Sequence, residues 1–218
     1  MNNLGGSLIQ QEMFSEAVST LQRALQILDA AQGDWRYWRA NCEHNLARAL
    51  RGLKRWDEAE AAIGRASALR EELGGKASPD SLNSSAILGG IYLDSGRLTE
   101  AKAVFENALE SSVQHLPRGH PQLALRHLDL ADCDLALGLL DDARIHYEET
   151  LRLGLALSGE RNPTMLEARL GLSETLASLD DASGARAQLA ATANAVAALP
   201  VGHSQKQRAR RIAASLVH

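Results

Sequence analysis

Five polar side chains that can hydrogen-bond or carry charge recur at helical spacing between residues 41 and 51. They are Asn41, His44, Asn45, Arg48 and Arg51, and a helix would place them along one stripe. An asparagine amide both donates and accepts, so it can pair with the backbone of an extended peptide of any sequence. The two guanidinium groups suit an acidic side chain or a C-terminal carboxylate, which each can bind through two hydrogen bonds. The stripe therefore predicts a face that binds a peptide or a protein.

Further candidates for this face lie at related positions along the chain, and Asn3 shares the phase of Asn45. The other candidates are Asn83, Asp94, Arg126, Asp129, Asp132, Glu167 and Glu174. The charges of these side chains predict a groove that is basic towards its start and acidic towards its end. Between these two ends, Gly90 is expected to leave an open floor. For any single residue, the alternative interpretation is an ordinary solvated helix face.

Catalytic and metal-binding interpretations find little support in the sequence. Cys42 and His44 are two residues apart, so on a helix they point to different faces, while His115 and His120 lie in or beside a loop without nearby thiols. No serine occupies a nucleophile turn, and no glycine-rich loop follows a strand pattern. We therefore expect no enzymatic activity, no metal and no cofactor.

The elements that must position these side chains follow a 42-residue period. The period is marked by Ala17, Ala59, Ala101, Ala143 and Ala185. Thirteen residues before each alanine lies a leucine followed by a small residue, and four residues after it lies a large apolar residue. In the copy at Leu88–Ala108, the apolar residues fall on one face of two helices around a break at Gly96. Small residues let two helices cross closely, so each copy predicts a helical hairpin.

Hairpins of fixed length bury their apolar faces on their neighbours, so we expect one continuous array and a single domain. The predicted fold is all-α, an α-solenoid of about five hairpins with a C-terminal capping helix. The expected segments are 1–33, 36–75, 78–117, 120–159 and 162–200, with the capping helix at 203–217. The first helix of the first segment is shorter than its later counterparts, so we expect that hairpin to be truncated.

One position departs from the repeat pattern. Asp134 stands where the other copies have Leu8, Leu50, Tyr92 and Leu176. A carboxylate buried without a partner is too costly, so either Leu135 rotates inward in its place or Asp134 finds a polar partner. We expect the first of these two arrangements.

Composition narrows the class of protein and its partners. The 218 residues are 45% hydrophobic but only 4% aromatic, which suits alanine- and leucine-rich helix packing. A net charge of −4 gives no overall attraction to nucleic acid or to anionic membranes. The two cysteines, Cys42 and Cys133, fit reduced thiols and a cytoplasmic location. In the last helix we expect Lys206, Arg208, Arg210 and Arg211 to form a solvated cap.

These motifs make the chain resemble the tetratricopeptide repeat (TPR) proteins, and its 42-residue period is similar to that of kinesin light chain repeats. The residues that carry the resemblance are Leu88, Gly89, Tyr92, Gly96, Ala101, Phe105 and Ala108, with His120–Pro121 in a linker. The resemblance covers essentially the whole chain. It implies a right-handed superhelix whose first helices line a concave groove, and a scaffold rather than an enzyme. The carboxylate-clamp pattern of chaperone-binding members is not reproduced.

The predicted function is a protein–protein interaction scaffold that binds a peptide or partner protein in the concave groove. The alternative is a regulatory or oligomerisation module attached to an upstream catalytic, kinase-like domain or to a DNA-binding domain, by analogy with bacterial regulators of similar architecture. The expected partner is a protein or peptide, not nucleic acid or a membrane, and self-association is left open.

Overall fold

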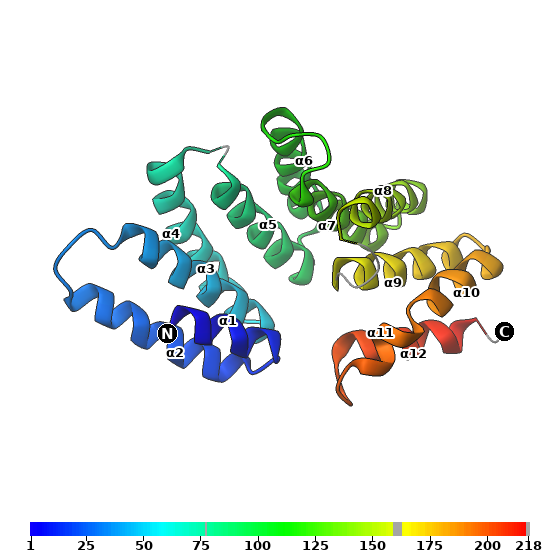
Figure 1. The fold of residues 1–218 in the computed structure, drawn as a ribbon, viewed down its shortest axis with the longest axis horizontal. Coiled ribbons are helices and arrows are strands. Elements are labelled where there is room, and N and C mark those ends of the chain that lie inside the picture. The colour runs from blue at the N-terminus through cyan, green and yellow to red at the C-terminus, as the bar shows by residue number, and fades with distance from the viewer. Residues whose placement is uncertain (77, 159–162, 217–218) are drawn as a thin grey trace. The chain divides into compact units, whose positions relative to one another are not determined.

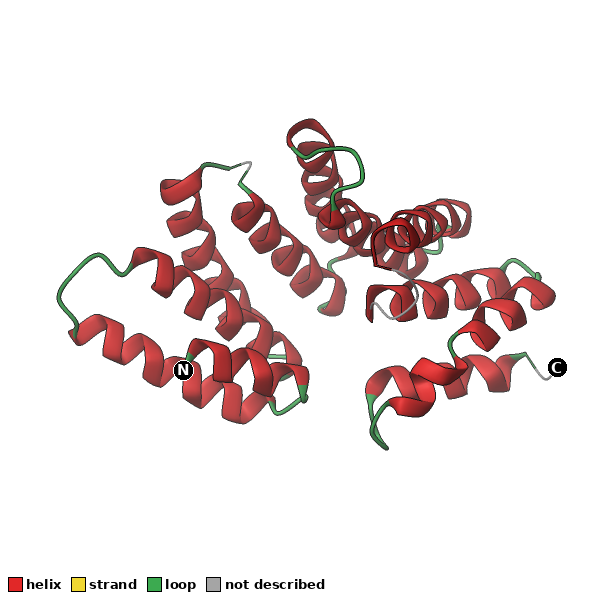
Figure 2. Cartoon of the chain, viewed as in Figure 1, coloured by secondary structure: helices red, strands yellow, loops and turns green. Residues whose placement is uncertain are grey.

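The computed structural model describes residues 1–76, 78–158 and 163–216. These residues form helices joined by short connections, and no strand occurs among them (Figure 2). The all-α prediction is confirmed. Three expected boundaries, at residues 159, 162 and 217, lie outside the described residues. Within the described residues, no helix is both long and apolar enough to cross a membrane.

The chain divides into two compact units, residues 1–111 and 112–218. Unit 1 contains the helices coloured blue to green in Figure 1. They are α1 (Asn2–Gln10), α2 (Phe14–Ala30), α3 (Arg36–Gly52), α4 (Trp56–Gly74), α5 (Pro79–Asp94) and most of α6 (Leu98–His115). Unit 2 contains α7 (Pro121–Leu137), α8 (Leu140–Ser158), α9 (Pro163–Ser178), α10 (Ala182–Ala191), α11 (Ala193–Ala198) and α12 (Ser204–Ser215).

Small residues are required where the helices of one pair cross. A Cβ atom on Gly89 would lie 2.4 Å from the ring of Phe105, and one on Gly5 would lie 2.7 Å from the side chain of Leu21. All five alanines of the period have no exposed surface. The repeated pairing predicted by the 42-residue period is therefore confirmed, and in these two pairs a small residue meets a large one at the crossing.

The first helices of successive pairs also contact each other. In unit 1, α1 packs on α3 and α3 packs on α5; in unit 2, α7 packs on α9 and α9 packs on α12. In each unit we call the solvent-facing surface of these first helices the inner face. Because side chains from neighbouring first helices meet there, it is the surface on which residues from separate repeats can combine.

Asp134 differs from the arrangement that we expected. Its side chain stays at the buried packing position, only 1% exposed, and its Oδ2 lies 3.8 Å from Nε2 of His146. Leu135 packs against the core of unit 2 as well. The expected substitution of Leu135 for Asp134 is thus wrong, because α8 supplies a polar partner that makes burial of the carboxylate tolerable.

Candidate functional site

The inner face of unit 1 carries a chain of hydrogen bonds from α1 to α3. Asn45 donates from Nδ2 to Oδ1 of Asn2 at 2.8 Å, and its own Oδ1 accepts from Nη1 of Arg48 at 3.3 Å. All three side chains are half-buried. The residue that bonds to Asn45 is therefore Asn2 and not Asn3. Asn3 shares the repeat phase of Asn45, but it is the side chain of Asn2 that points from α1 towards α3.

Arg51 of the same stripe is already neutralised. Its Nε donates to Oδ2 of Asp94, at the end of α5, at 2.6 Å. The guanidinium also covers Gly90, where a Cβ atom would lie 2.3 Å from Nη1 of Arg51. The expected open floor at Gly90 is thus wrong, because the missing side chain is used to seat the arginine.

Arg48 is the cation of this face that keeps its charge available. On α3 it lies between Asn45, which faces α1, and Arg51, which faces α5, so it points to the middle of the inner face. Among the described residues, no carboxylate lies within ion-pair distance of its guanidinium. Burial, and next the neighbouring charge of Arg51, lower the pKa of Arg48. The negative charge of an anion bound here would act against both effects, because an opposite charge favours the charged guanidinium.

Asn41 and His44 do not join Asn45 and Arg48. Instead, both contact Arg70 of α4: Nη2 of Arg70 donates to Oδ1 of Asn41 at 3.0 Å, and Nη1 lies 2.9 Å from Nδ1 of His44. Burial, followed by the charges of Arg70 and Arg48, lowers the pKa of His44 to about 3. The imidazole is therefore neutral at pH 7 and can accept a hydrogen bond from Arg70.

The sequence analysis missed Arg70, although a signal for it existed. The positions at whole 42-residue intervals from Arg70 are occupied by Leu28, Ser112, Gly154 and Val196. A charged residue in a phase that is otherwise apolar or small indicates a buried charge with a special environment. Arg70 is indeed only 7% exposed.

The remaining candidates in unit 1 take separate positions. Asn3 is exposed and, with Ile27, Trp35 and Trp38, lines a cavity of about 390 Å³ beside α1. Asn83 is half-buried on α5 and already has an interaction partner. The structure does not bring either residue into contact with Asn45 or Arg48.

The acidic candidates in unit 2 are neutralised within the unit. Arg208 of α12 donates from Nε and Nη2 to Oε2 of Glu174 on α9, at 3.1 and 2.6 Å. Tyr147, which is fully buried, donates to Oδ1 of Asp132 at 2.5 Å. Burial works to lower the pKa of Arg208, but Glu174 and Asp132 raise it overall. The expected solvated cap is therefore wrong for Arg208, because α12 turns this residue towards the acidic side chains.

The other acidic-end candidates are also engaged. Arg126 is 4% exposed, and its Nη1 lies 3.5 Å from Oδ2 of Asp129 one turn later on α7. Glu167 accepts from Nε2 of Gln205, on α12, at 2.8 Å. The first pair lies within α7 and the second connects α9 with α12, and both leave little free charge for a ligand.

A metal-dependent catalytic centre would need several ligating side chains grouped within residues 1–76, 78–158 and 163–216. There, no group of three His, Cys, Asp or Glu side chains is placed to hold a metal ion. Both cysteines are buried free thiols. On the inner face of unit 1, the described residues offer amides and the guanidinium of Arg48, with which no carboxylate pairs, and such groups can form hydrogen bonds to a ligand.

Solved structures of similar fold place this geometry in context. A kinesin light chain-like protein from Podosopora anserina with nearly identical TPR-like repeats is 19% identical, with a TM-score of 0.65, covering 100% of this chain and 95% of that one. A thermophilic TPR protein from Thermus thermophilus is 19% identical, with a TM-score of 0.67 and coverages of 99% and 97%.

A third structure is longer than this chain. The Rap conjugation gene regulator of plasmid pLS20, in complex with the Phr* peptide, is 16% identical with a TM-score of 0.82, covering 94% of this chain but only 55% of the regulator. At these identities the likeness establishes the fold alone.

Sequence comparison identifies the family directly. A search of curated protein sequences found no match. The family model of the tetratricopeptide repeat, however, matches three overlapping stretches, residues 1–72, 38–112 and 80–156. The matches together span residues 1–156, which is more than half of the chain. The chain belongs to the tetratricopeptide repeat family.

Proposed function

We propose that this protein is an interaction scaffold that binds an acidic peptide segment, from a partner protein or a free peptide, on the inner face of unit 1. Repeat arrays of stacked helix pairs present extended surfaces of this kind. The observation that carries the proposal is Arg48, a half-buried guanidinium in the middle of that face with no carboxylate partner among the described residues.

The neighbours of Arg48 favour a peptide over a small ion. The amides of Asn45 and Asn2 lie along the same face and can exchange their mutual hydrogen bond for bonds to a peptide backbone. A carboxylate of the ligand would pair with Arg48 through two charge-assisted hydrogen bonds. Two of the solved structures of similar fold are described as complexes with the Phr* peptide and with the competence and sporulation factor, which supports a peptide ligand by analogy.

The test uses selection of random peptides on the full chain, followed by calorimetric titration of the enriched peptides. We expect enrichment of Asp, Glu or free C-terminal carboxylates, and at least tenfold weaker binding to Arg48→Ala, about 1.4 kcal/mol. Arg23→Ala is the matched control, since Arg23 is an exposed arginine on the second helix α2. Selected peptides that lack acidic groups, or that bind Arg48→Ala as tightly as the unmodified chain, would contradict the proposal.

A second candidate function is a regulatory or oligomerisation module attached to a catalytic or DNA-binding domain. The supporting observation is that this chain spans 52% and 55% of two Rap structures of similar fold. Sequencing the genomic reading frame around the coding region tests this candidate. A continuous frame that encodes a further domain would support it, and stop codons that flank the repeats would contradict it.

A further inference from the structure

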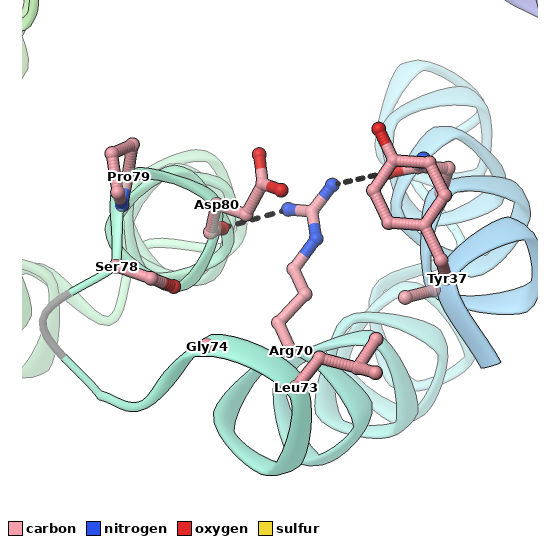
Figure 3. Close-up of a pocket in the computed structure, with 9 residues that line it drawn as sticks. Tyr37, Arg70, Leu73, Gly74, Ser78, Pro79 and Asp80 are labelled. Atoms are coloured by element: carbon pink, nitrogen blue, oxygen red, sulfur yellow. Dashed lines mark hydrogen bonds between the residues drawn. The ribbon is translucent and has the colours of Figure 1, made fainter.

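Unit 1 has a cavity that neither Asn45 nor Arg48 lines, where α3 begins, α4 ends and α5 begins. It encloses about 310 Å³, near the lower limit for small-ligand sites. The residues that line it include Tyr37, Asn41, Arg70, Leu73, Ser78 and Asp80. Figure 3 shows the Arg70 side chain extending from α4 between Asp80, in the first turn of α5, and Tyr37 of α3.

Arg70 is a buried cation whose hydrogen-bond acceptors are all neutral. Besides Asn41 and His44, its guanidinium donates to the main-chain oxygen of Asp80 at 2.9 Å and to Oγ of Ser84 at 2.8 Å. No carboxylate among the described residues lies within ion-pair distance, and the buried Nε has no hydrogen-bond partner there. Such an orphaned N–H group is costly, so native structures usually satisfy it with water or a ligand.

The Nε–Nη2 edge of Arg70 is the part of the guanidinium that other arginines of this chain use for carboxylates. Arg55 binds Glu58 through Nε and Nη2, at 2.7 and 2.6 Å. Arg65 binds Glu43 through the same two atoms, at 2.7 and 2.8 Å. In Arg70 this edge carries only the Asn41 oxygen on Nη2 and nothing on Nε.

The electrostatic surroundings of the cavity favour an anion on balance. Burial lowers the pKa of Arg70 more than the charge of Asp80 raises it, so the guanidinium lacks a sufficient counter-charge. The first turn of α5, with Ser78 as its N-cap and Pro79 following, adds the positive end of a helix dipole. The Asp80 carboxylate opposes this, but it is exposed to solvent, which screens it.

Apolar side chains form the other part of the cavity wall. Tyr37 and Leu73 are 53% and 44% exposed, so both are free to change rotamer when a ligand enters. We propose that this cavity binds a carboxylate carried by an apolar group, with the Nε–Nη2 edge of Arg70 as its principal donor. The carboxylate belongs either to the C-terminus of a peptide or to an acidic side chain. This site is additional to the proposed inner-face function and does not depend on Arg48.

The test follows the Arg70 Nε–H resonance by nitrogen-15 NMR of the full chain. The probe is N-acetyl-L-leucine, and N-acetyl-L-leucinamide is the same apolar group without the carboxylate. We expect a saturable shift of the Arg70 resonance with the acid and at least tenfold weaker binding of the amide. Equal binding of N-acetyl-L-leucine and its amide would overturn the proposal. So would the absence of a saturable shift with both N-acetyl-L-leucine and a second carboxylate probe. This second probe is N-acetyl-L-glutamic acid α-amide, whose carboxylate is that of an acidic side chain, whereas N-acetyl-L-leucine carries a C-terminal carboxylate. The probe that binds more tightly identifies the source of the carboxylate.

A pair of variants avoids removing Arg70, whose loss would disturb the contacts among α3, α4 and α5. Leu73→Glu places a carboxylate three residues after Arg70, in the spacing of Arg55 and Glu58, and we expect this carboxylate to pair with the Nε–Nη2 edge. We expect Leu73→Glu to bind N-acetyl-L-leucine at least tenfold more weakly than the neutral variant of equal size, Leu73→Gln, and Arg48→Ala, which lies outside the cavity, to bind it with near-native affinity. Unchanged affinity in Leu73→Glu would exclude Arg70 as the donor.

Discussion

The inner faces of the two units are built from the same repeat positions but use their charges in opposite ways. In unit 2, Arg208 from α12 neutralises Glu174, and Tyr147 holds Asp132. In unit 1, the pair Arg51–Asp94 neutralises one arginine, while Arg48 keeps its charge. The comparison shows that repeat phase places a polar residue on the inner face without deciding whether it stabilises the fold or remains available to a ligand.

Among the charged residues of the two inner faces, Arg208 should cause the largest loss of stability when it is removed. Arg208→Met leaves Glu174 and Asp132 without their cation, and we expect unit 2 to lose about 2–3 kcal/mol of stability. Hydrogen exchange resolves the units, with faster exchange expected in α7, α9 and α12 and unchanged exchange in α3. Arg210→Met is the matched control on the same helix, since Arg210 is exposed. Equal losses in the two variants would mean that α12 stabilises unit 2 through packing alone.

Acid should weaken unit 1 through His44. Its folded pKa of about 3 lies below the ordinary 6.5, so the unfolded chain takes up a proton first as the pH falls. The stability contributed by the neutral imidazole is complete above pH 6.5 and is lost progressively towards pH 3. Urea unfolding measures the free energy of unfolding at pH 7 and at pH 5. Between these two values, it should fall by up to about 2 kcal/mol more in the unmodified chain than in His44→Gln, which keeps an acceptor for Arg70 but cannot titrate. Identical pH dependence in both proteins would contradict this account.

Removing Arg48 should have the smallest effect on stability. Because its only hydrogen bond among the described residues is 3.3 Å long and no carboxylate pairs with it, we expect Arg48→Met to change the free energy of unfolding by less than about 0.5 kcal/mol. Arg51→Met, which leaves Asp94 unpaired, should cost about 0.5–1 kcal/mol. Urea unfolding of the two variants measures the difference. A larger loss for Arg48→Met would show that Arg48 is structural and would weaken its assignment to ligand binding.

The sequence by itself determined the architecture. The period of Ala17, Ala59 and their successors, with its leucines and large apolar residues, appears in the structure as pairs of helices that cross at small residues. This succeeds because the packing contact within a pair is local and identical in each copy, so that repetition reveals it. The same logic failed at Asp134, where His146 on the next helix lies beside the carboxylate and is not a feature of the period.

Only the tertiary structure decided which charges remain free. Arg208 and Glu174 are 34 residues apart, and the contact of Arg70 with Asn41 spans 29 residues. Long side chains reach several alternative partners at similar cost, so their pairing depends on which groups neighbouring helices project into the same space. The 42-residue pattern could place Arg48, Arg51 and Arg70 on their helices, but it could not tell that only Arg51 among them meets a carboxylate in the described residues.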